Sequence, residues 1–549
     1  MDYTMDFQGD DEIIVSADDI MRAIKQLMEE DKEIRKKVKE MSRISEKTLM
    51  PGGSSHSSLA TKSSPVCKLI ETSCKMKKAQ LVFIPAPIIG HFVSAVELAK
   101  LLVDRDERLS ITVLVMETSL SPNIARSYID SVISAWSRIR FVHMPDVELD
   151  PSLPGRFFIS LIEAQKSHVK EEVSKLVLES ESCSDSPRLA GFVLDMFFAS
   201  IIDAANEFGV PSYIFFTSAA SFLGLAFHIQ ALHDEQKVDP TEFTNSDVEL
   251  VVPCLASPFP VKLSPSSLLG KEWLPFFFRM IRRLREAKGI MVNTFYELES
   301  HALNSFSDGN FPPVYPVGPI LSLNSHENHT RHKDIMQWLD HQPSSSVVYL
   351  CFGSMGSFSV EQVKEIASGL ERSGHRFLWS LRQPPPDGKM EAPSDYVNPE
   401  EVLPEGFLDR TSEIGKIIGW APQVDILDHP SIGGFVSHCG WNSTLESIWF
   451  DVPMATWPMF AEQQFNAFLM VVEFGLAMEI KINYRKAYNM DGCEIVRAEE
   501  IEKGIRGLME IDREKLKEIS EKSRKALMRD GSSYTCSARL IQDIIDNMA

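Results

Sequence analysis

The clearest chemical signal in this chain lies in residues 420–463, where polar side chains follow short apolar runs. An apolar run at 432–436 leads into a turn that contains His438 and Gly440, and a helical pattern follows from Thr444. Gly440 lets the backbone approach a ligand closely, and residues 442–444 lie where a helix leaves its first amide N–H groups without partners. Such a turn suits an anion, and phosphate is the anion that fits it best.

Other side chains in the same stretch could hold further parts of a ligand. Trp420 follows an apolar run at 416–419 and offers a flat face on which a nucleobase could stack. Glu446, Glu462 and Gln463 could bind hydroxyl groups. The implied ligand therefore combines a base, hydroxyls and phosphates. Each residue alone is better explained by a capped helix, a core tryptophan or solvated acids, so the prediction depends on the whole set.

His91 and Asp195 could act as a base and its acid partner. His91 lies in a strand-to-helix loop, where the helix dipole disfavours the protonated ring and keeps a nitrogen available to accept a proton. Asp195 ends a separate strand predicted at 189–194, and the ends of parallel strands gather at one edge of a sheet. The two side chains can therefore meet. Asp195 alone would also fit an acid at the start of a helix, given Ser200 beyond it, but its placement with His91 favours catalysis.

The surrounding segments alternate between strand and helix patterns, which predicts parallel sheets covered by helices on both faces. Strands of the first half are predicted at 81–85, 111–115, 139–142, 189–194, 211–216 and 289–292. The pattern restarts after a polar run at 324–333, with strands at 347–352 and 377–381 and a helix from Ser359, so that run marks a domain boundary. The proline-rich segment 383–404 is predicted to be a surface loop.

Taken together, residues 420–463 resemble the sugar-nucleotide signature of the plant UDP-sugar-dependent glycosyltransferases that act on small molecules, and the resemblance covers Lys77 to the C-terminus. It implies an α/β fold of GT-B architecture, with two facing Rossmann-like, doubly wound domains and a C-terminal tail that crosses back to the first. The expected parts are an N-terminal helical extension at 1–75, an acceptor-binding domain at 76–323 and a UDP-sugar-binding domain at 324–549.

The resemblance also implies roles for the donor-site residues. The matching positions are Trp420 and Ala421 for uracil, Gln423 and Glu446 for ribose, Ser354, His438, Asn442 and Ser443 for the diphosphate, and Trp441, Glu462 and Gln463 for the sugar. The family's glucose users carry glutamine at the position of Gln463, so UDP-glucose is the expected donor, although one glutamine does not exclude xylose or galactose. Asp451 stands where the family usually has glycine, and we expect a local cost with an intact site, because aspartate tolerates unusual backbone angles.

His91 and Asp195 fall on the family's catalytic pair. The implied reaction transfers the sugar from its diphosphate to an acceptor hydroxyl in one displacement that inverts the anomeric carbon. His91 removes the acceptor proton, Asp195 orients the ring, and His438 with the amides at 442 and 443 meets the charge on the leaving diphosphate. No metal and no cofactor beyond the donor substrate is needed. The acceptor is expected to be a phenolic such as a flavonoid, or a terpenoid.

A set of aromatic side chains in the first half could line an apolar acceptor pocket. The set comprises Phe157, Phe197, Phe198, Phe276 and Phe277. Core packing is the commoner fate of such clusters, so both interpretations stay open.

The composition of the chain excludes some classes of partner and predicts its cellular compartment. The 549 residues are 44% hydrophobic, enough for more than one core, and the formal net charge of −21 disfavours a nucleic-acid or anionic-membrane partner. The 8 cysteines lack paired metal or redox spacing, and no stretch is long and apolar enough to span a bilayer, so we expect a cytoplasmic protein, and a monomer. His326, His329 and His332 have a possible ligand spacing but lie in the polar run, and we assign them to solvent.

The N-terminal extension echoes the C-terminal tail. Residues 3–58 parallel residues 484–537, and VSADDI at 15–20 matches VRAEEI at 496–501. Apolar residues at helical spacing predict two amphipathic helices, followed by a linker at 51–64. The copy contains no ligand-binding residue, so we interpret it as a remnant of fusion with a related gene. The alternative is a helical arm that mimics the docking of the tail.

Two other classes of protein make different predictions. A non-catalytic sugar-nucleotide-binding protein would have lost His91 or Asp195, and both are present. A nicotinamide oxidoreductase would carry a GxGxxG turn after its first strand, and APIIGH at 86–91 is not such a turn.

Overall fold

The computed structural model describes residues 78–118, 126–147, 154–182, 186–323, 330–386, 392–485 and 494–548. The chain divides into two compact units, Met1–Met76 and Lys77–Ala549, and every described residue belongs to the second. The helices and linker expected in the N-terminal extension therefore lie outside the described residues, as do His326 and His329.

Seven parallel strands form the first sheet, in the order β3-β2-β1-β4-β5-β8-β9. Their bounds are β1 Ala79–Ile84, β2 Leu109–Val115, β3 Ile139–His143, β4 Arg188–Asp195, β5 Ser212–Phe216, β8 Gly289–Val292 and β9 Val314–Pro316. Alternate residues of β1 belong to two different apolar clusters, Leu81 and Phe83 to one and Val82 and Ile84 to the other. Both faces of the sheet are therefore covered, as its long apolar runs predict.

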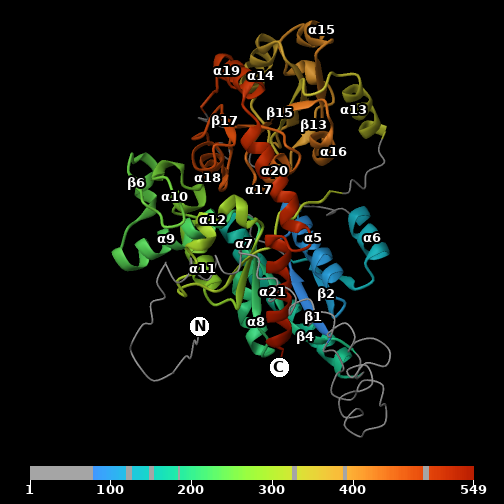
Figure 1. The fold of residues 1–549 in the computed structure, drawn as a ribbon, viewed down its shortest axis with the longest axis vertical. Coiled ribbons are helices and arrows are strands. Elements are labelled where there is room, and N and C mark those ends of the chain that lie inside the picture. The colour runs from blue at the N-terminus through green and yellow to red at the C-terminus, as the bar shows by residue number, and fades with distance from the viewer. Residues whose placement is uncertain are drawn as a thin grey trace, which may run out of the picture. The chain divides into compact units, whose positions relative to one another are not determined.

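Helices connect these strands and cover the sheet (Figure 1). They are α5 (Ile89–Arg105), α6 (Arg126–Ala135), α7 (Pro154–Glu181), η1 (Met196–Ile201), α8 (Ile202–Glu207), α9 (Ala220–Gln236), η2 (Pro240–Asn245), η3 (Val261–Leu263), α10 (Ser266–Leu269), α11 (Leu274–Leu284) and α12 (Tyr296–Asn304). The short strands β6 (Glu249–Leu250) and β7 (Phe259–Pro260) pair with each other, apart from the main sheet.

Six parallel strands form the second sheet, in the order β14-β11-β10-β15-β16-β17. Their bounds are β10 Val347–Cys351, β11 Arg376–Ser380, β14 Gly415–Ile418, β15 Ile432–Ser437, β16 Met454–Thr456 and β17 Ala477–Glu479. The helices here are α13 (Thr330–Asp340), α14 (Val360–Ser373), η4 (Pro399–Glu401), α15 (Phe407–Thr411), α16 (Gln423–Asp428), α17 (Trp441–Trp449), α18 (Gln463–Phe468) and η5 (Leu469–Glu473). Two doubly wound sheets confirm the predicted fold class.

The ends of two helices test the sequence patterns. Ser359 caps α14 as expected, because its Oγ accepts a hydrogen bond from the Gln362 N–H. The helix expected from Thr444 begins three residues earlier, at Trp441. Gly440 takes the extended N-cap conformation, so the Thr444 N–H already closes the first helical hydrogen bond, to the Gly440 carbonyl at 2.9 Å.

The C-terminal tail passes from the second sheet to the first, as expected (red in Figure 1). It consists of α19 (Ala498–Glu510), α20 (Glu514–Leu527) and α21 (Ser532–Asp546). Helix α19 packs on α14, α20 packs between α17 and α12, and α21 packs on β9. The Tyr315 hydroxyl of β9 donates to Asp543 Oδ2 of α21 at 2.6 Å, which fixes the last helix on the first sheet.

The proline-rich segment contains more regular structure than a surface loop. Strand β12 (Arg382–Gln383) pairs antiparallel with β13 (Ser394–Asp395).

Within the described part of the chain, no helix combines the length and the apolar character needed to cross a membrane.

Candidate active site

In each sheet the strand order reverses between two neighbouring strands, β1 and β4 in the first and β10 and β15 in the second. Ligands of open α/β sheets bind outside the carboxyl ends of the strands at such a switch point. His91 and Asp195 follow or end the strands at the first switch point, and Ser354 and His438 follow those at the second. The two predicted groups therefore occupy corresponding places in the two sheets.

The predicted pair at the first switch point is in direct contact. His91 Nδ1 lies 2.7 Å from Asp195 Oδ2 and 3.0 Å from Thr217 Oγ1. Asp195 Oδ1 also accepts a hydrogen bond from the Phe197 N–H at 2.9 Å, so the carboxylate both caps η1 and pairs with the ring. A carboxylate can only accept, so the proton lies on Nδ1 and the lone pair of Nε2 is available to take another.

The electrostatics of His91 differ from the expectation drawn from the helix dipole. Burial lowers the pKa of His91. The charge and hydrogen bond of Asp195, together with the charge of Glu462, raise the pKa by more than burial lowers it, so the net pKa lies above its ordinary value. The predicted lowering is therefore wrong in direction. A carboxylate in hydrogen-bond contact raises the pKa of a histidine by more than the partial charge of a helix end lowers it.

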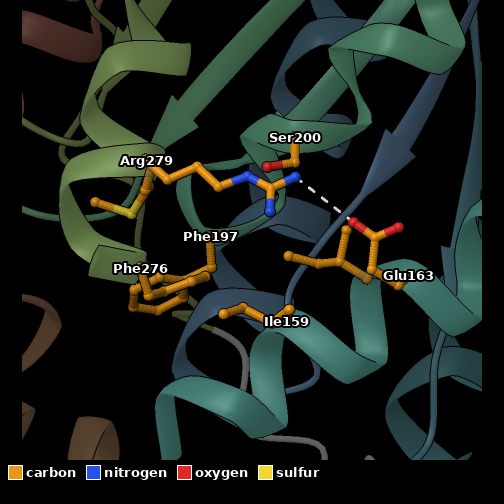
Figure 2. Close-up of a pocket in the computed structure, with 8 residues that line it drawn as sticks. Ile159, Glu163, Phe197, Ser200, Phe276 and Arg279 are labelled. Atoms are coloured by element: carbon orange, nitrogen blue, oxygen red, sulfur yellow. Dashed lines mark ion pairs between the residues drawn. The ribbon is translucent and has the colours of Figure 1, made fainter. Parts of the chain in front are cut away.

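The five phenylalanines considered for an acceptor pocket separate into two groups. Phe157, Phe198, Phe276 and Phe277 are buried in the core, whereas Phe197 is only partly buried. Phe197 stacks on the His91 ring with centroids 5.2 Å apart, and with Phe276 it lines a small pocket (Figure 2). The other lining residues are Ile159, Ile162, Glu163, Ser200, Arg279 and Met280, of which Arg279 and Glu163 form an ion pair at 3.6 Å. Phe197 is thus the member of the set that contacts the candidate base.

At the second switch point, two glycines make room for the His438 ring. A Cβ added to Gly353 or to Gly440 would lie 2.5 Å from His438 Nε2, and Gly353 has φ +74°. The ring is buried, and its Nδ1 has no hydrogen-bond partner in the described part of the chain. Burial lowers the pKa of His438 to about 4, so the ring is neutral at physiological pH. Ser354 directly follows Gly353 in the same loop.

The first turn of α17 is held against the first domain, next to the loop of His91. Asn442 Nδ2 donates to the Gly90 carbonyl and to Ser94 Oγ, each at 3.1 Å. The Trp441 indole donates to the Asn293 carbonyl at 2.7 Å and is buried. Because that indole faces the first domain, a sugar contact by Trp441 would have to come from its backbone.

The two residues expected to bind ribose are hydrogen-bonded to each other. Gln423 Nε2, on α16, lies 2.6 Å from Glu446 Oε2 and 2.8 Å from Ser443 Oγ, both on α17. Burial raises the pKa of Glu446 to about 7, although the hydrogen bond from Gln423 opposes the shift. The tertiary structure therefore brings together three residues predicted to contact the donor.

The residues at the two ends of the predicted donor site lie in the second domain, after strands β14 and β16. Trp420 follows β14 with its side chain exposed, and Ala421 packs against the core of the second domain. Glu462 Oε1 accepts a hydrogen bond from Ser218 Oγ of the first domain at 3.4 Å. Gln463 Oε1 accepts from the Met459 and Phe460 N–H groups at 2.9 and 3.0 Å, which leaves its amide nitrogen for a ligand.

Asp451 has the backbone angle that the comparison with glycine predicts. Its φ is +57°, in the left-handed region. Its Oδ1 is buried and has no hydrogen-bond partner in the described ranges, and burial raises its pKa in spite of Arg513, Arg524 and Lys517. Asp451 therefore strains the turn that follows α17, at the end of the helix opposite Trp441.

Several residues that take part in these contacts were not identified from the sequence, and three of them follow strands. Thr217 and Ser218 follow β5, and Asn293 follows β8. Polar residues directly after apolar strands were the available signal, since such positions gather at the switch-point edge.

Of the three histidines in the polar run, His332 pairs with Asp425 at 2.9 Å, and no cluster of three metal-ligating side chains occurs among the described residues.

Known proteins are similar to this chain in sequence. Residues 271–491 match the family model of UDP-glucoronosyl and UDP-glucosyl transferases. The chain is 58% identical to anthocyanidin 3-O-glucosyltransferase 1 of Manihot esculenta, over 83% of this chain and 100% of that protein. It is 55% identical to UDP-glycosyltransferase 71A15 of Malus domestica, over 85% of this chain and 100% of the relative.

Solved structures agree with these sequence matches. The chain is 49% identical to a UGT transferase from Siraitia grosvenorii in complex with UDP, with a TM-score of 0.75 over 85% of this chain and 100% of that one. It is 40% identical to UGT71G1 of Medicago truncatula complexed with UDP-glucose, again with a TM-score of 0.75, over 85% of this chain and 98% of that one.

Proposed function

The chain belongs to the family of UDP-glycosyltransferases that these plant proteins represent, and from that premise we propose that it transfers glucose from UDP-glucose to a hydroxyl of a small lipophilic acceptor, with inversion at the anomeric carbon. The observation that carries the proposal is the contact of His91 with Asp195 at the first switch point. Next to this pair, residues of the first domain form hydrogen bonds with α17 and with Glu462 of the second domain.

His91 is the proposed base. Its Nε2 takes the proton of the acceptor hydroxyl while the hydroxyl oxygen forms a bond to the anomeric carbon. The bond from that carbon to the diphosphate oxygen breaks, and its electron pair leaves with UDP. Asp195 then stabilises the imidazolium through the 2.7 Å contact with Nδ1, and Thr217 restricts the ring to the same orientation. One displacement from the face opposite the diphosphate gives inversion.

The second switch point is the proposed donor site. Trp420 would stack on uracil, and Gln423 with Glu446 would hold the ribose hydroxyls, which the 2.6 Å contact between the two side chains supports. The neutral His438 ring and the free N–H groups at the start of α17 would stabilise the charge that develops on the leaving diphosphate. We propose that these groups suffice without a metal ion, so turnover should persist in excess EDTA.

The proposed acceptor is a phenolic of the flavonoid class. Relatives with 52–58% identity carry the names of anthocyanidin and flavonoid 3-O-glucosyltransferases, which supports this choice. An apolar ring beside the base also supports it, because Phe197 lies stacked on His91, where an aromatic acceptor would present its hydroxyl. A terpenoid acceptor remains the second candidate within the same chemistry.

The test is turnover of UDP-glucose against a panel of flavonoids, simple phenols and terpenoids, with UDP-xylose and UDP-galactose as competing donors. We expect glucosylation of at least one flavonoid, and a β-linked product by NMR, since the donor is α-linked. An α-linked product would refute the single displacement. UDP release without any glycoside, across the whole panel, would refute the proposed acceptor class.

A further inference from the structure

One face of the Trp420 indole is covered by the side chain of Arg382, which directly precedes the segment that the sequence assigns to a surface loop. The guanidinium carbon of Arg382 lies 5.4 Å from the centre of the Trp420 ring. The Arg382 side chain is 11% exposed, whereas Trp420 is 48% exposed. Arg382 therefore supports the indole from the protein side and leaves the rest of the ring accessible to a ligand.

Three acceptors fix the Arg382 guanidinium in this place. Its Nε lies 3.2 Å from Asp395 Oδ1 and 3.3 Å from the Ser394 carbonyl, and its Nη2 donates to the Pro393 carbonyl. Arg382 and Asp395 are also direct partners in the pairing of β12 with β13. A guanidinium held at several N–H groups has few alternative orientations, so it forms a rigid backing for the ring.

Asp395 joins the same segment to the main chain of Trp420. Its Oδ1 accepts a hydrogen bond from the Trp420 N–H at 2.9 Å. Gly419 permits this approach, because a Cβ at that position would lie 2.3 Å from Asp395 Cγ. Ser380 Oγ donates to the Gly419 carbonyl at 2.8 Å from the end of β11. Both the ring and the backbone of Trp420 are thus positioned by one two-stranded segment.

We propose that Arg382 and Asp395 are positioning residues for the nucleobase of the donor, holding Trp420 in the orientation in which its open face stacks on uracil. The inference rests on the proposed function, in which Trp420 binds the base. A half-exposed indole without this support would populate several rotamers, and selecting one of them on binding would cost affinity. The contacts that position Trp420 lie outside the diphosphate turn, so the effect is specific to the base.

The test compares a ligand that contains the base with one that lacks it. The dissociation constant of UDP is measured by calorimetry for the full-length protein and for Arg382→Ala, and that of inorganic pyrophosphate by competition with UDP. We expect UDP to bind about 10-fold more weakly to Arg382→Ala, with pyrophosphate unchanged. The KM for UDP-glucose should rise by a similar factor with little change in kcat, since the base takes no part in the chemical step.

Three further variants control for general loss of structure. Arg410→Ala removes another arginine of the second domain, whose ion pair with Glu371 lies on the surface, and should change neither constant. Arg382→Lys keeps the cation and should recover part of the UDP affinity. Asp395→Asn keeps an oxygen for the Trp420 N–H but removes the charge facing Arg382, and should weaken UDP by about 2-fold to 3-fold even if Arg382→Ala does not fold.

The outcomes separate the inference from the function on which it rests. An unchanged UDP constant in Arg382→Ala, or equal weakening of UDP and pyrophosphate, would overturn the positioning role. Failure of the unaltered protein to bind UDP would overturn the proposed function, and the inference with it.

Discussion

The two switch points of this molecule each present a histidine at the carboxyl edge of a parallel sheet, but the surroundings of the two rings are opposite. His91 is paired with a carboxylate at 2.7 Å, and its pKa is raised. His438 is enclosed by two glycines, its Nδ1 has no partner among the described residues, and its pKa is lowered to about 4. One ring is therefore prepared to take up a proton, and the other is kept neutral.

The difference shows how one topology supports two chemical tasks. The first sheet places an aspartate at the end of β4, and the second places His438 directly after the corresponding strand β15. A base needs a partner that stabilises its protonated form, whereas a ring beside a diphosphate needs only to offer a neutral donor. The predictions below test this contrast, beginning with the largest expected effect.

Removing the candidate base should have the largest effect. We expect His91→Ala to lower kcat by about 10³-fold, because the substitution removes the group that is proposed to accept the acceptor proton. The dissociation constant of UDP should be unchanged, since the hydrogen bonds and ring contacts of His91 are to Asp195, Thr217 and Phe197, all in the first domain. Steady-state kinetics and calorimetry measure the two quantities. If kcat stayed near that of the unaltered protein, His91 would not be the base, and the proposed difference in role between His91 and His438 would be wrong.

Removing the partner of that base should have a smaller effect on rate and a characteristic effect on pH dependence. Asp195→Asn can still accept the Phe197 N–H and keep η1 capped, and we expect it to lower kcat by about 10²-fold. Asp195 raises the pKa of His91, so its loss lowers that pKa. Because the base acts in its neutral form, the acid limb of kcat/KM should move to lower pH. A limb that stays in place or moves upward would contradict the pairing.

The second histidine should affect the rate without affecting its pH profile. We expect His438→Ala to lower kcat by about 10-fold to 10²-fold through loss of one donor to the leaving group. The pKa of His438 is about 4, so the ring does not titrate between about pH 5.5 and 9, and the acid limb should coincide with that of the unaltered protein. His438→Gln, which retains a donor, is the matched control. A displaced limb in His438→Ala would show that this ring also acts through its charge.

The smallest effect is expected at Asp451, the acid at the far end of α17. Glycine relieves the φ of +57° and removes a buried oxygen without a described partner, so Asp451→Gly should raise the free energy of unfolding by about 1 kcal/mol. Denaturant unfolding measures the change, and UDP affinity should stay constant. Asp530→Gly is the control, since Asp530 also has positive φ but an exposed side chain. A larger rise in the free energy of unfolding for Asp530→Gly than for Asp451→Gly would show that backbone strain alone explains the stabilisation.

Much of the fold was predictable because its signals are local. Long apolar runs separated by helical patterns predicted strands such as 189–194 and 432–436, and the structure places strands there. The proline-rich composition predicts a loop at 383–404, and the two strands that lie there, Arg382–Gln383 and Ser394–Asp395, are too short to leave a periodic pattern. The contact of this segment with Trp420 leaves no local signal either, because Trp420 lies 25 positions beyond Asp395.

The order of residue types along the chain was enough to predict which polar residues follow which strands, and so to predict that His91 and Asp195 share one edge of a sheet and that Ser354 and His438 share another. The contacts of each side chain could be known only from the folded molecule. Folding turned the Trp441 indole and the Asn442 amide toward the first domain, reversed the expected shift of the His91 pKa, and placed Arg382 behind Trp420. Local periodicity determines where strands lie along the chain, whereas hydrogen-bond partners and electrostatic environment depend on groups that are distant in the chain and meet only when the core is packed.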